Sequence, residues 1–163
     1  MRCCVIGFVV LAACGGGKAK VDRADAQAKV GEEAAKLVGI AVASTTCPAD
    51  IAAGAGTSFA CEVTFTGGGV LTFKVEQTDA TGTLVVTPAG DWVLGDRMEK
   101  DLETEMFLLG HEAATVECGN AVMPVTIPAQ VQCTVKNAGA TATKVAVAVD
   151  KDRNVDWKLV GAP

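Results

Sequence analysis

Cysteine is the residue type whose number and spacing in this chain could support chemistry. The 163-residue sequence contains seven cysteines, two serines and one histidine, and it has no tyrosine. A thiol can be acylated, oxidised to a disulfide or used as a metal ligand, so the position of each cysteine decides which of these fates is open to it. With one histidine and two serines, the chain offers few residues for nucleophilic catalysis.

The N-terminus has the pattern of an export signal. Arg2 is followed by a short apolar run over residues 5–11, then by small residues and Cys14. A positive charge, a short apolar segment and small residues before a cleavage site are typical of secretory signals. The run is too short to span a bilayer, which needs about 20 apolar residues. We therefore expect residues 1–13 to be a signal peptide.

The four residues Leu11-Ala12-Ala13-Cys14 resemble the lipobox of bacterial lipoproteins. The resemblance implies that Cys14 is acylated and becomes the first residue, with residues 14–20 as lipidated cysteine and flexible tether. Two or more acyl chains give stable anchoring. The implied location is exported and lipid-anchored to the cell membrane or outer membrane, facing the periplasm or the exterior. The alternatives are a plain secretory signal, which leaves Cys14 as an unpaired thiol, and a buried N-terminal strand.

Four cysteines remain in the expected mature chain, and they are best explained as disulfides. They are Cys47, Cys61, Cys118 and Cys133. An even number of cysteines in an exported protein predicts disulfides, and four allow three connectivities. The similar separations of 14 and 15 residues favour Cys47–Cys61 and Cys118–Cys133. A four-cysteine zinc site is the alternative, but its ligands usually come as CxxC-type pairs, which this sequence lacks. We predict no metal ligand and no cofactor.

Other polar candidates have a structural interpretation that competes with a functional one. His111 could be a general base or metal ligand, but a cation near a helix C-terminus is favoured, because no serine or cysteine nucleophile is assigned to it. The segment Asp150-Lys151-Asp152-Arg153-Asn154 begins like a calcium loop. Val155 and Gly161 stand where an EF-hand needs glycine and glutamate, so a hairpin turn is favoured.

Three further features also have a structural interpretation beside a functional one. Trp92 could be a recognition aromatic, although a plug packed between two halves of the chain is favoured. The turn over residues 67–69 lacks the lysine and helix of a phosphate-binding loop. A set of acidic residues could form a docking face or paired catalytic carboxylates, but a solvated helix face is favoured; the set comprises Glu99, Asp101, Glu103, Glu105 and Glu112.

The elements that must position these residues follow the same order twice. Residues 21–43 have helical periodicity, and strands are predicted at 44–47, 58–65, 71–75 and 83–87. In the second half, strands are predicted at 114–118, 130–136, 144–149 and 155–159. The apolar stripe of the first helix is expected to comprise Val30, Ala34, Leu37, Val38 and Ala41.

A second helix is predicted to begin at Asp96, which with Glu99 has the spacing of a capping box. Its expected stripe is Met98, Leu102, Met106 and Leu109, and Gly110 is expected to end it. We therefore predict an α+β fold of two tandem units, over residues 21–95 and 96–163. Each unit would be one helix packed on a small antiparallel sheet of three to four strands, with an internal disulfide.

The first half resembles a small domain of unknown function that is common in exported bacterial proteins and lipoproteins. The residues that carry the resemblance are Thr46-Cys47-Pro48 and Gly56-Thr57-Ser58-Phe59-Ala60-Cys61. In the second half, Gly119 replaces the proline and Val131-Gln132-Cys133 replaces the Phe-x-Cys. The resemblance implies no activity and no catalytic residue. The two-unit plan is similar in architecture to secreted beta-lactamase-inhibitory proteins.

Charge and composition narrow the classes of function. A net charge of −5 without a basic cluster argues against nucleic acid as a partner. We predict a lipid-anchored, non-enzymatic binding module, in contact with the membrane through its lipid and with an envelope protein or glycan through residues that the sequence does not identify. The alternative is an inhibitor of, or a hydrolase acting on, cell-wall or secreted components.

Overall fold

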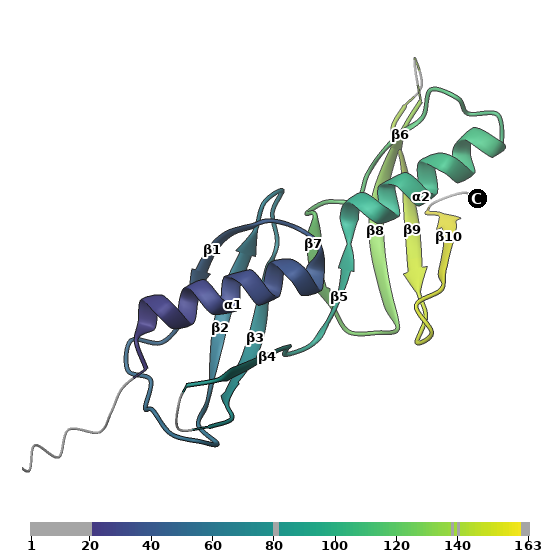
Figure 1. The fold of residues 1–163 in the computed structure, drawn as a ribbon. Coiled ribbons are helices and arrows are strands. Elements are labelled where there is room, and N and C mark those ends of the chain that lie inside the picture. The colour runs from purple at the N-terminus through teal and green to yellow at the C-terminus, as the bar shows by residue number, and fades with distance from the viewer. Residues whose placement is uncertain (1–20, 80–81, 138, 140, 161–163) are drawn as a thin grey trace, which may run out of the picture.

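The computed structural model describes residues 21–79, 82–137, 139 and 141–160, and in this part of the chain the fold is α+β (Figure 1). One four-stranded antiparallel sheet has the order β1 (Val42–Thr46), β2 (Ser58–Phe65), β3 (Val70–Gln77), β4 (Leu84–Pro88). A second has the order β10 (Val155–Leu159), β9 (Thr143–Val149), β8 (Ala129–Lys136), β6 (Thr115–Glu117). A short ribbon of β5 (Asp91–Leu94) and β7 (Val122–Val125) lies between them (Figure 1).

Helix α1 (Arg23–Val38) is shorter than its predicted span. The carboxylate of Asp22 accepts hydrogen bonds from the N–H groups of Ala24 and Asp25 at 2.8 and 3.1 Å, which caps the first turn. Gly39 ends the helix in the left-handed conformation, with φ of 79°. The prediction was therefore wrong about two residues of the stripe. Leu37 is 49% exposed, and Ala41 lies beyond the helix; the buried residues are spaced by four, at Ala26, Val30, Ala34 and Val38.

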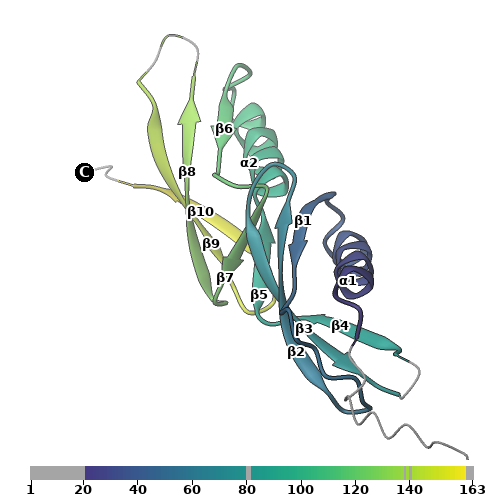
Figure 2. The same ribbon diagram turned by 90° about the vertical axis from the view of Figure 1, so that its left-hand side faces the viewer.

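Helix α1 packs against one face of the first sheet, and the buried side chains of the sheet lie on that face. Cys61 and Val63 of β2 are buried. In the antiparallel register they pair with Phe73 and Leu71 of β3, which are also buried. Their exposed neighbours alternate with them, as the period-two pattern predicts. Figure 2 shows α1 and α2 each on one face of its own sheet. Helix α1 contacts all four strands of the first sheet.

Helix α2 (Gly95–Leu108) begins directly after β5, and the predicted capping box is absent. Leu94 is the residue at its N-cap, without a side-chain hydrogen bond, and Asp96 lies within the first helical turn. The prediction was wrong because the N-cap lies two residues earlier, at Leu94, where β5 already fixes the path of the chain. Met98, Leu102 and Met106 are buried as expected, whereas Leu109 is 59% exposed. Within the described residues, neither helix is both long and apolar enough to cross a membrane.

The β5–β7 ribbon was not predicted, and it joins the two halves through the glycine turn at residues 67–69. The N–H groups of Ala121 and Val122 donate hydrogen bonds to the carbonyls of Gly67 and Gly68 at 3.1 and 3.3 Å. Gly69 has a φ of 100°, and a methyl group there would overlap the carbonyl oxygen of Val122. The turn therefore requires glycine for close backbone approach. It is a turn, as expected, and it serves as the docking point for β7.

Candidate functional site

The four cysteines of the expected mature chain form the two disulfides that their spacing favours. Cys47, directly after β1, is bonded to Cys61 of β2, and Cys118, directly after β6, is bonded to Cys133 of β8. All four are buried in the apolar cores. As disulfides they fix each first strand of a sheet to the strand beside it. Cys14, the predicted lipidation site, lies outside the described residues.

The structure does not assemble the candidate catalytic residues. His111 is exposed just beyond α2, where its backbone N–H donates to the carbonyl of Met106 at 2.9 Å. Ser44 and Ser58 lie on β1 and β2 of the other sheet. Across the described residues there is no group of three or more histidine, cysteine, aspartate or glutamate side chains placed to hold a metal ion.

The calcium-like segment forms the tight turn between β9 and β10. The Asp150 carboxylate accepts hydrogen bonds from the N–H groups of Asp152 and Asn154, both at 2.8 Å, and from the Asn154 side-chain amide at 2.9 Å. These bonds, the one from the Asn154 side chain first, lower the pKa of Asp150. Its oxygens therefore stabilise the turn, which agrees with the favoured interpretation of this segment.

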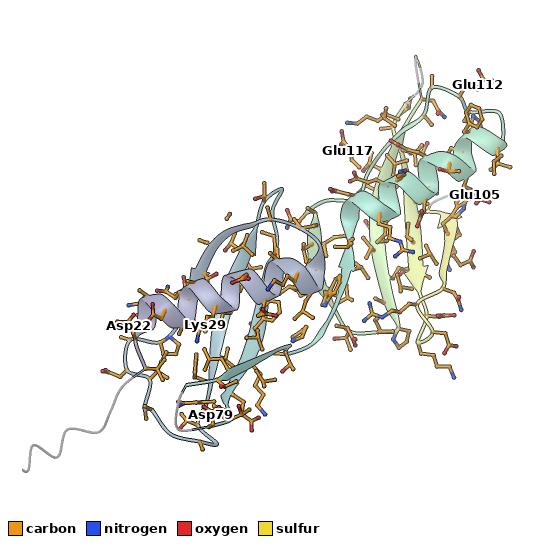
Figure 3. The ribbon with its side chains drawn as sticks, viewed as in Figure 1. Asp22, Lys29, Asp79, Glu105, Glu112 and Glu117 are labelled. Carbon is orange, nitrogen blue, oxygen red and sulfur yellow. A yellow bond between two sulfur atoms is a disulfide. The ribbon has the colours of Figure 1, made fainter. Side chains whose placement is uncertain are left out.

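The acidic residues of α2 divide into two groups that face different parts of the second sheet. Glu99 accepts a hydrogen bond from the N–H of Cys118 at 2.7 Å, and Glu103 accepts one from the N–H of Val116 at 3.1 Å. Glu105 lies on the opposite side of the helix from Glu117 of β6, and Glu112 lies beyond the C-terminus of α2 (Figure 3). The first two are structural, and Asp101 and Glu105 line a cavity.

That cavity and its neighbour adjoin one another along α2 and the β10 side of the second sheet, and we call the pair of cavities the Trp groove. The two cavities have volumes of about 240 and about 210 Å³, and they share Met98, Asp101 and Val155. Both tryptophans of the chain line the groove, one in each cavity. The full lining is Trp92, Val93, Leu94, Arg97, Met98, Asp101, Leu102, Glu105, Val147, Val149, Arg153, Val155 and Trp157.

The groove is open because α2 is displaced toward β6. Glu99 and Glu103 bind the backbone of β6, and α2 packs most closely on that strand. In the first half α1 contacts β4, the last strand of its sheet. In the second half the last strand is β10, and its residue Val155 is 47% exposed. The floor of the groove is apolar, and its rim carries charged side chains from both walls.

Trp92 sits at the end of the groove where the two halves meet. Its half-buried ring packs against the core of the first half and also lines the groove. The guanidinium of Arg153 lies 5.8 Å from the ring centroid, a cation–π arrangement. The same guanidinium lies 3.5 Å from Asp91 and donates to the carbonyl of Trp92 at 3.4 Å. Trp92 is therefore both packed between the halves and accessible from the groove.

Sequence reasoning did not identify the groove as a site. It placed Val155 and Trp157 on one face of a strand, but it did not place that face beside Asp101 and Glu105 of the second helix. The two pairs of residues are at least fifty positions apart in the sequence. The local signal was the presence of two tryptophans, Trp92 near the boundary between the halves and Trp157 on a predicted strand.

A family model described as Domain of unknown function (DUF4333) matches residues 4–82, just under half of the chain. A DUF4333 domain is thus present in the first half, as the Cys-Pro and Phe-x-Cys residues suggested. The matched segment includes α1, β1 to β3 and the Cys47–Cys61 disulfide, and it contains none of the Trp groove. No curated protein and no solved structure matches the chain.

Proposed function

We propose that this chain is an exported lipoprotein whose folded part is a non-enzymatic binding module, and that the Trp groove receives its partner in the cell envelope. The Trp groove is the observation that carries the proposal. It is concave, it has an apolar floor, and it places two tryptophans and several charged side chains where a partner can reach them. Both tryptophans are half-buried, and tryptophan is enriched in recognition surfaces, where one end of the ring is apolar and the other reaches polar groups.

The anchoring part of the proposal rests on the sequence of residues 1–20, with Cys14 as the acylated residue. The arrangement of the described residues suits it. Helix α1 starts at one end of the molecule, and α2 and β10, which form the groove, lie at the other end (Figure 1). A lipid anchor before α1 would hold the first half next to the membrane and leave the groove facing away from it.

Binding is favoured over hydrolysis because the groove lacks the serine and histidine side chains of a nucleophilic hydrolase. His111 and the two serines are not among its lining residues. Each cavity is also smaller than the roughly 300–1,000 Å³ of a site for a drug-sized ligand. Cavities of this size suit individual side chains of a macromolecular partner. Turnover of an ester, peptide or glycan substrate that His111→Ala abolishes would contradict the non-enzymatic assignment.

We also propose that the two halves are tandem units of common origin. In each half a helix precedes the first edge strand, a cysteine follows that strand, and its disulfide partner lies on the neighbouring strand. The two loops between the bonded cysteines differ by one residue in length. The ribbon strand β7, inserted between β6 and β8, is the main departure of the second half from this plan.

The anchoring claim is tested by feeding cells an alkyne analogue of palmitate. The wild-type chain should carry the label and fractionate with membranes, and Cys14→Ser should lose the label and be released. A wild-type chain without label would contradict anchoring, whatever the groove binds.

The binding claim is tested by crosslinking intact cells and recovering the full chain under denaturing conditions. A discrete crosslinked product should be lost in Trp157→Ala, which removes a wall of the groove. Leu37→Ala is the matched control, because Leu37 is an exposed apolar residue on α1, outside the groove. A product that survives Trp157→Ala unchanged would contradict a partner in the groove.

A further inference from the structure

We infer that the ligand of the Trp groove is an extended peptide segment of another protein, with alternating apolar and basic residues, that adds as a strand to the outer edge of β10. The inference rests on the proposed function, because it specifies the chemistry of the partner at the same groove. Strand addition to a sheet edge is an established mode of peptide recognition.

The backbone of β10 leaves one set of hydrogen-bonding groups directed away from its sheet. Asp150 donates its N–H to the carbonyl of Asn154, and Val160 donates to the carbonyl of Lys144, both at 3.0 Å. Hydrogen-bonded pairs recur every second residue in an antiparallel ladder, so the residues of β10 between these two bonds alternate in the direction of their backbone groups. Those of Val155 and Trp157 point outward. In agreement, the N–H of Trp157 donates to the carboxylate of Asp156 at 2.9 Å instead of to β9.

The edge strands β1 and β6 are blocked by side chains from a neighbouring helix. On β1, the side-chain amide of Gln27 donates to the carbonyl of Thr45 at 2.6 Å, and the register with β2 is irregular. On β6, Glu99 and Glu103 accept from the N–H groups of Cys118 and Val116. Such devices prevent unwanted strand pairing.

The edge of β4 is a poor site for an added strand for another reason. Among the residues that the structure describes, the edge of β10 has none of the obstacles found at β1, β6 and β4. Ala89 donates to the carbonyl of Thr72, which places Pro88, a residue without an N–H, among the outward residues of β4. The register of β10 with β9 is regular over five residue pairs. In the described part of the chain, the hydrogen bond at its outer edge comes from Asp156, which is exposed and belongs to the strand itself. A partner carbonyl can replace that carboxylate.

The two residues of β10 whose backbone groups point outward, Val155 and Trp157, also have side chains that line the groove. Val155 and Trp157 form its sheet-side wall, so alternate side chains of an added strand would lie beside them and opposite α2. An apolar side chain of the added strand that faces α2 would enter the cavity that Met98 and Leu102 line. The added strand therefore gains backbone hydrogen bonds from the edge and specificity from the two cavities.

The charge of the helix wall favours a basic peptide. Asp101 and Glu105 line the groove, and α2 has no basic residue in its last turn to offset the negative end of its dipole. Arg97 lies 3.8 Å from Asp101 and is already engaged there, whereas Glu105 has no ion pair among the described residues. A lysine or arginine of the peptide would complement Glu105.

The test uses the full chain carrying Cys14→Ser and a synthetic octapeptide of alternating lysine and valine. Binding should be saturable, and it should slow amide hydrogen exchange at Val155 and Trp157 by about tenfold or more, because their outward N–H groups become bonded. The same peptide N-methylated at every residue keeps its side chains and charge but has no N–H donors, and its methyl groups obstruct the close approach of a strand, so it should not bind. Equal binding of the N-methylated peptide would overturn strand addition.

Charge reversal tests the polarity of the site. Glu105→Lys should weaken binding of the lysine–valine peptide by about tenfold and strengthen binding of a glutamate–valine peptide. Glu112→Lys makes the same change of net charge outside the groove and should have a much smaller effect. Equal effects of the two variants would overturn docking beside Glu105. Failure to bind any strand-forming peptide would overturn the inference, and the crosslinking test with Trp157→Ala would still report whether the groove has a partner of another kind.

Discussion

The N–H of Cys118 donates a 2.7 Å hydrogen bond to the carboxylate of Glu99, and this contact ties helix α2 to the outer edge of β6. Glu103 makes the equivalent bond to Val116 at 3.1 Å, one helical turn later. Together they place the helix over the β6 side of its sheet. The Trp groove on the β10 side is the space that this placement leaves uncovered.

We predict that Glu99→Ala destabilises the fold by about 1–3 kcal/mol, because it leaves a partly buried backbone N–H without its acceptor. Glu99→Gln keeps an acceptor oxygen and should lose less. The measurement is the free energy of unfolding in urea. Glu112→Ala, at an exposed glutamate beyond the C-terminus of α2, serves as control and should change stability little. Equal losses for Glu99→Ala and Glu112→Ala would contradict the structural role of Glu99.

Gly69→Ala should destabilise the chain more than Gly82→Ala. Both glycines have φ values in the left-handed region, at 100° and 94°, so alanine costs about 1–2 kcal/mol at either. Only at Gly69 would the added methyl group also overlap the carbonyl of Val122 and displace β7. Urea unfolding of the two variants measures the difference. Similar losses would show that the turn does not dock on β7 as closely as described.

Each disulfide should contribute about 3 kcal/mol to the free energy of unfolding, because each closes a loop of similar length. The double variants Cys47→Ala/Cys61→Ala and Cys118→Ala/Cys133→Ala isolate the two contributions in denaturant unfolding. Cys14→Ser is the control that removes a cysteine without breaking either bond, and it should leave the transition unchanged. A loss confined to one of the pairs would contradict the similar roles that we assign to them.

The turn between β9 and β10 should weaken in acid. Hydrogen bonds from Asn154 lower the pKa of Asp150 from its ordinary value of 3.8, so the ionised carboxylate stabilises the folded turn. A lowered folded-state pKa means that this contribution is complete above the ordinary value and is lost as the pH falls through the folded value. An NMR titration of the Asp150 carboxyl carbon should have its midpoint below 3.8, and Asn154→Ala should raise that midpoint. A midpoint unchanged by Asn154→Ala would contradict the assigned cause.

The sequence was most informative where one short segment determines the result. The span of β2 was predicted to the residue, because alternation of apolar and small or polar side chains is a local property of residues 58–65. The disulfide pairing followed from separation along the chain. In the same way, Met98, Leu102 and Met106 were placed on the buried stripe of α2.

It was least informative where a residue acts through a distant segment. Asp96 and Glu99 have capping-box spacing, but tertiary structure gives the Glu99 carboxylate to Cys118, 19 residues later. Gly69 has the composition of an ordinary turn, and nothing local indicates its contact with Val122. Leu37 and Leu109 fit their stripes by periodicity, yet both are exposed, and Leu109 is the C-cap residue beyond the end of α2. The Trp groove likewise lies between segments that are distant in the sequence, α2 and β10.

Site-specific photocrosslinking on intact cells tests the central claim, that the Trp groove is where a partner binds. A photoreactive phenylalanine is introduced at Val155 in the full chain, and at Lys29, an exposed position on α1 in the other half (Figure 3). We predict a discrete crosslinked product from position 155 that disappears when Trp157→Ala is added, and no such product from position 29. The same product from both positions, or none from position 155, would contradict the claim.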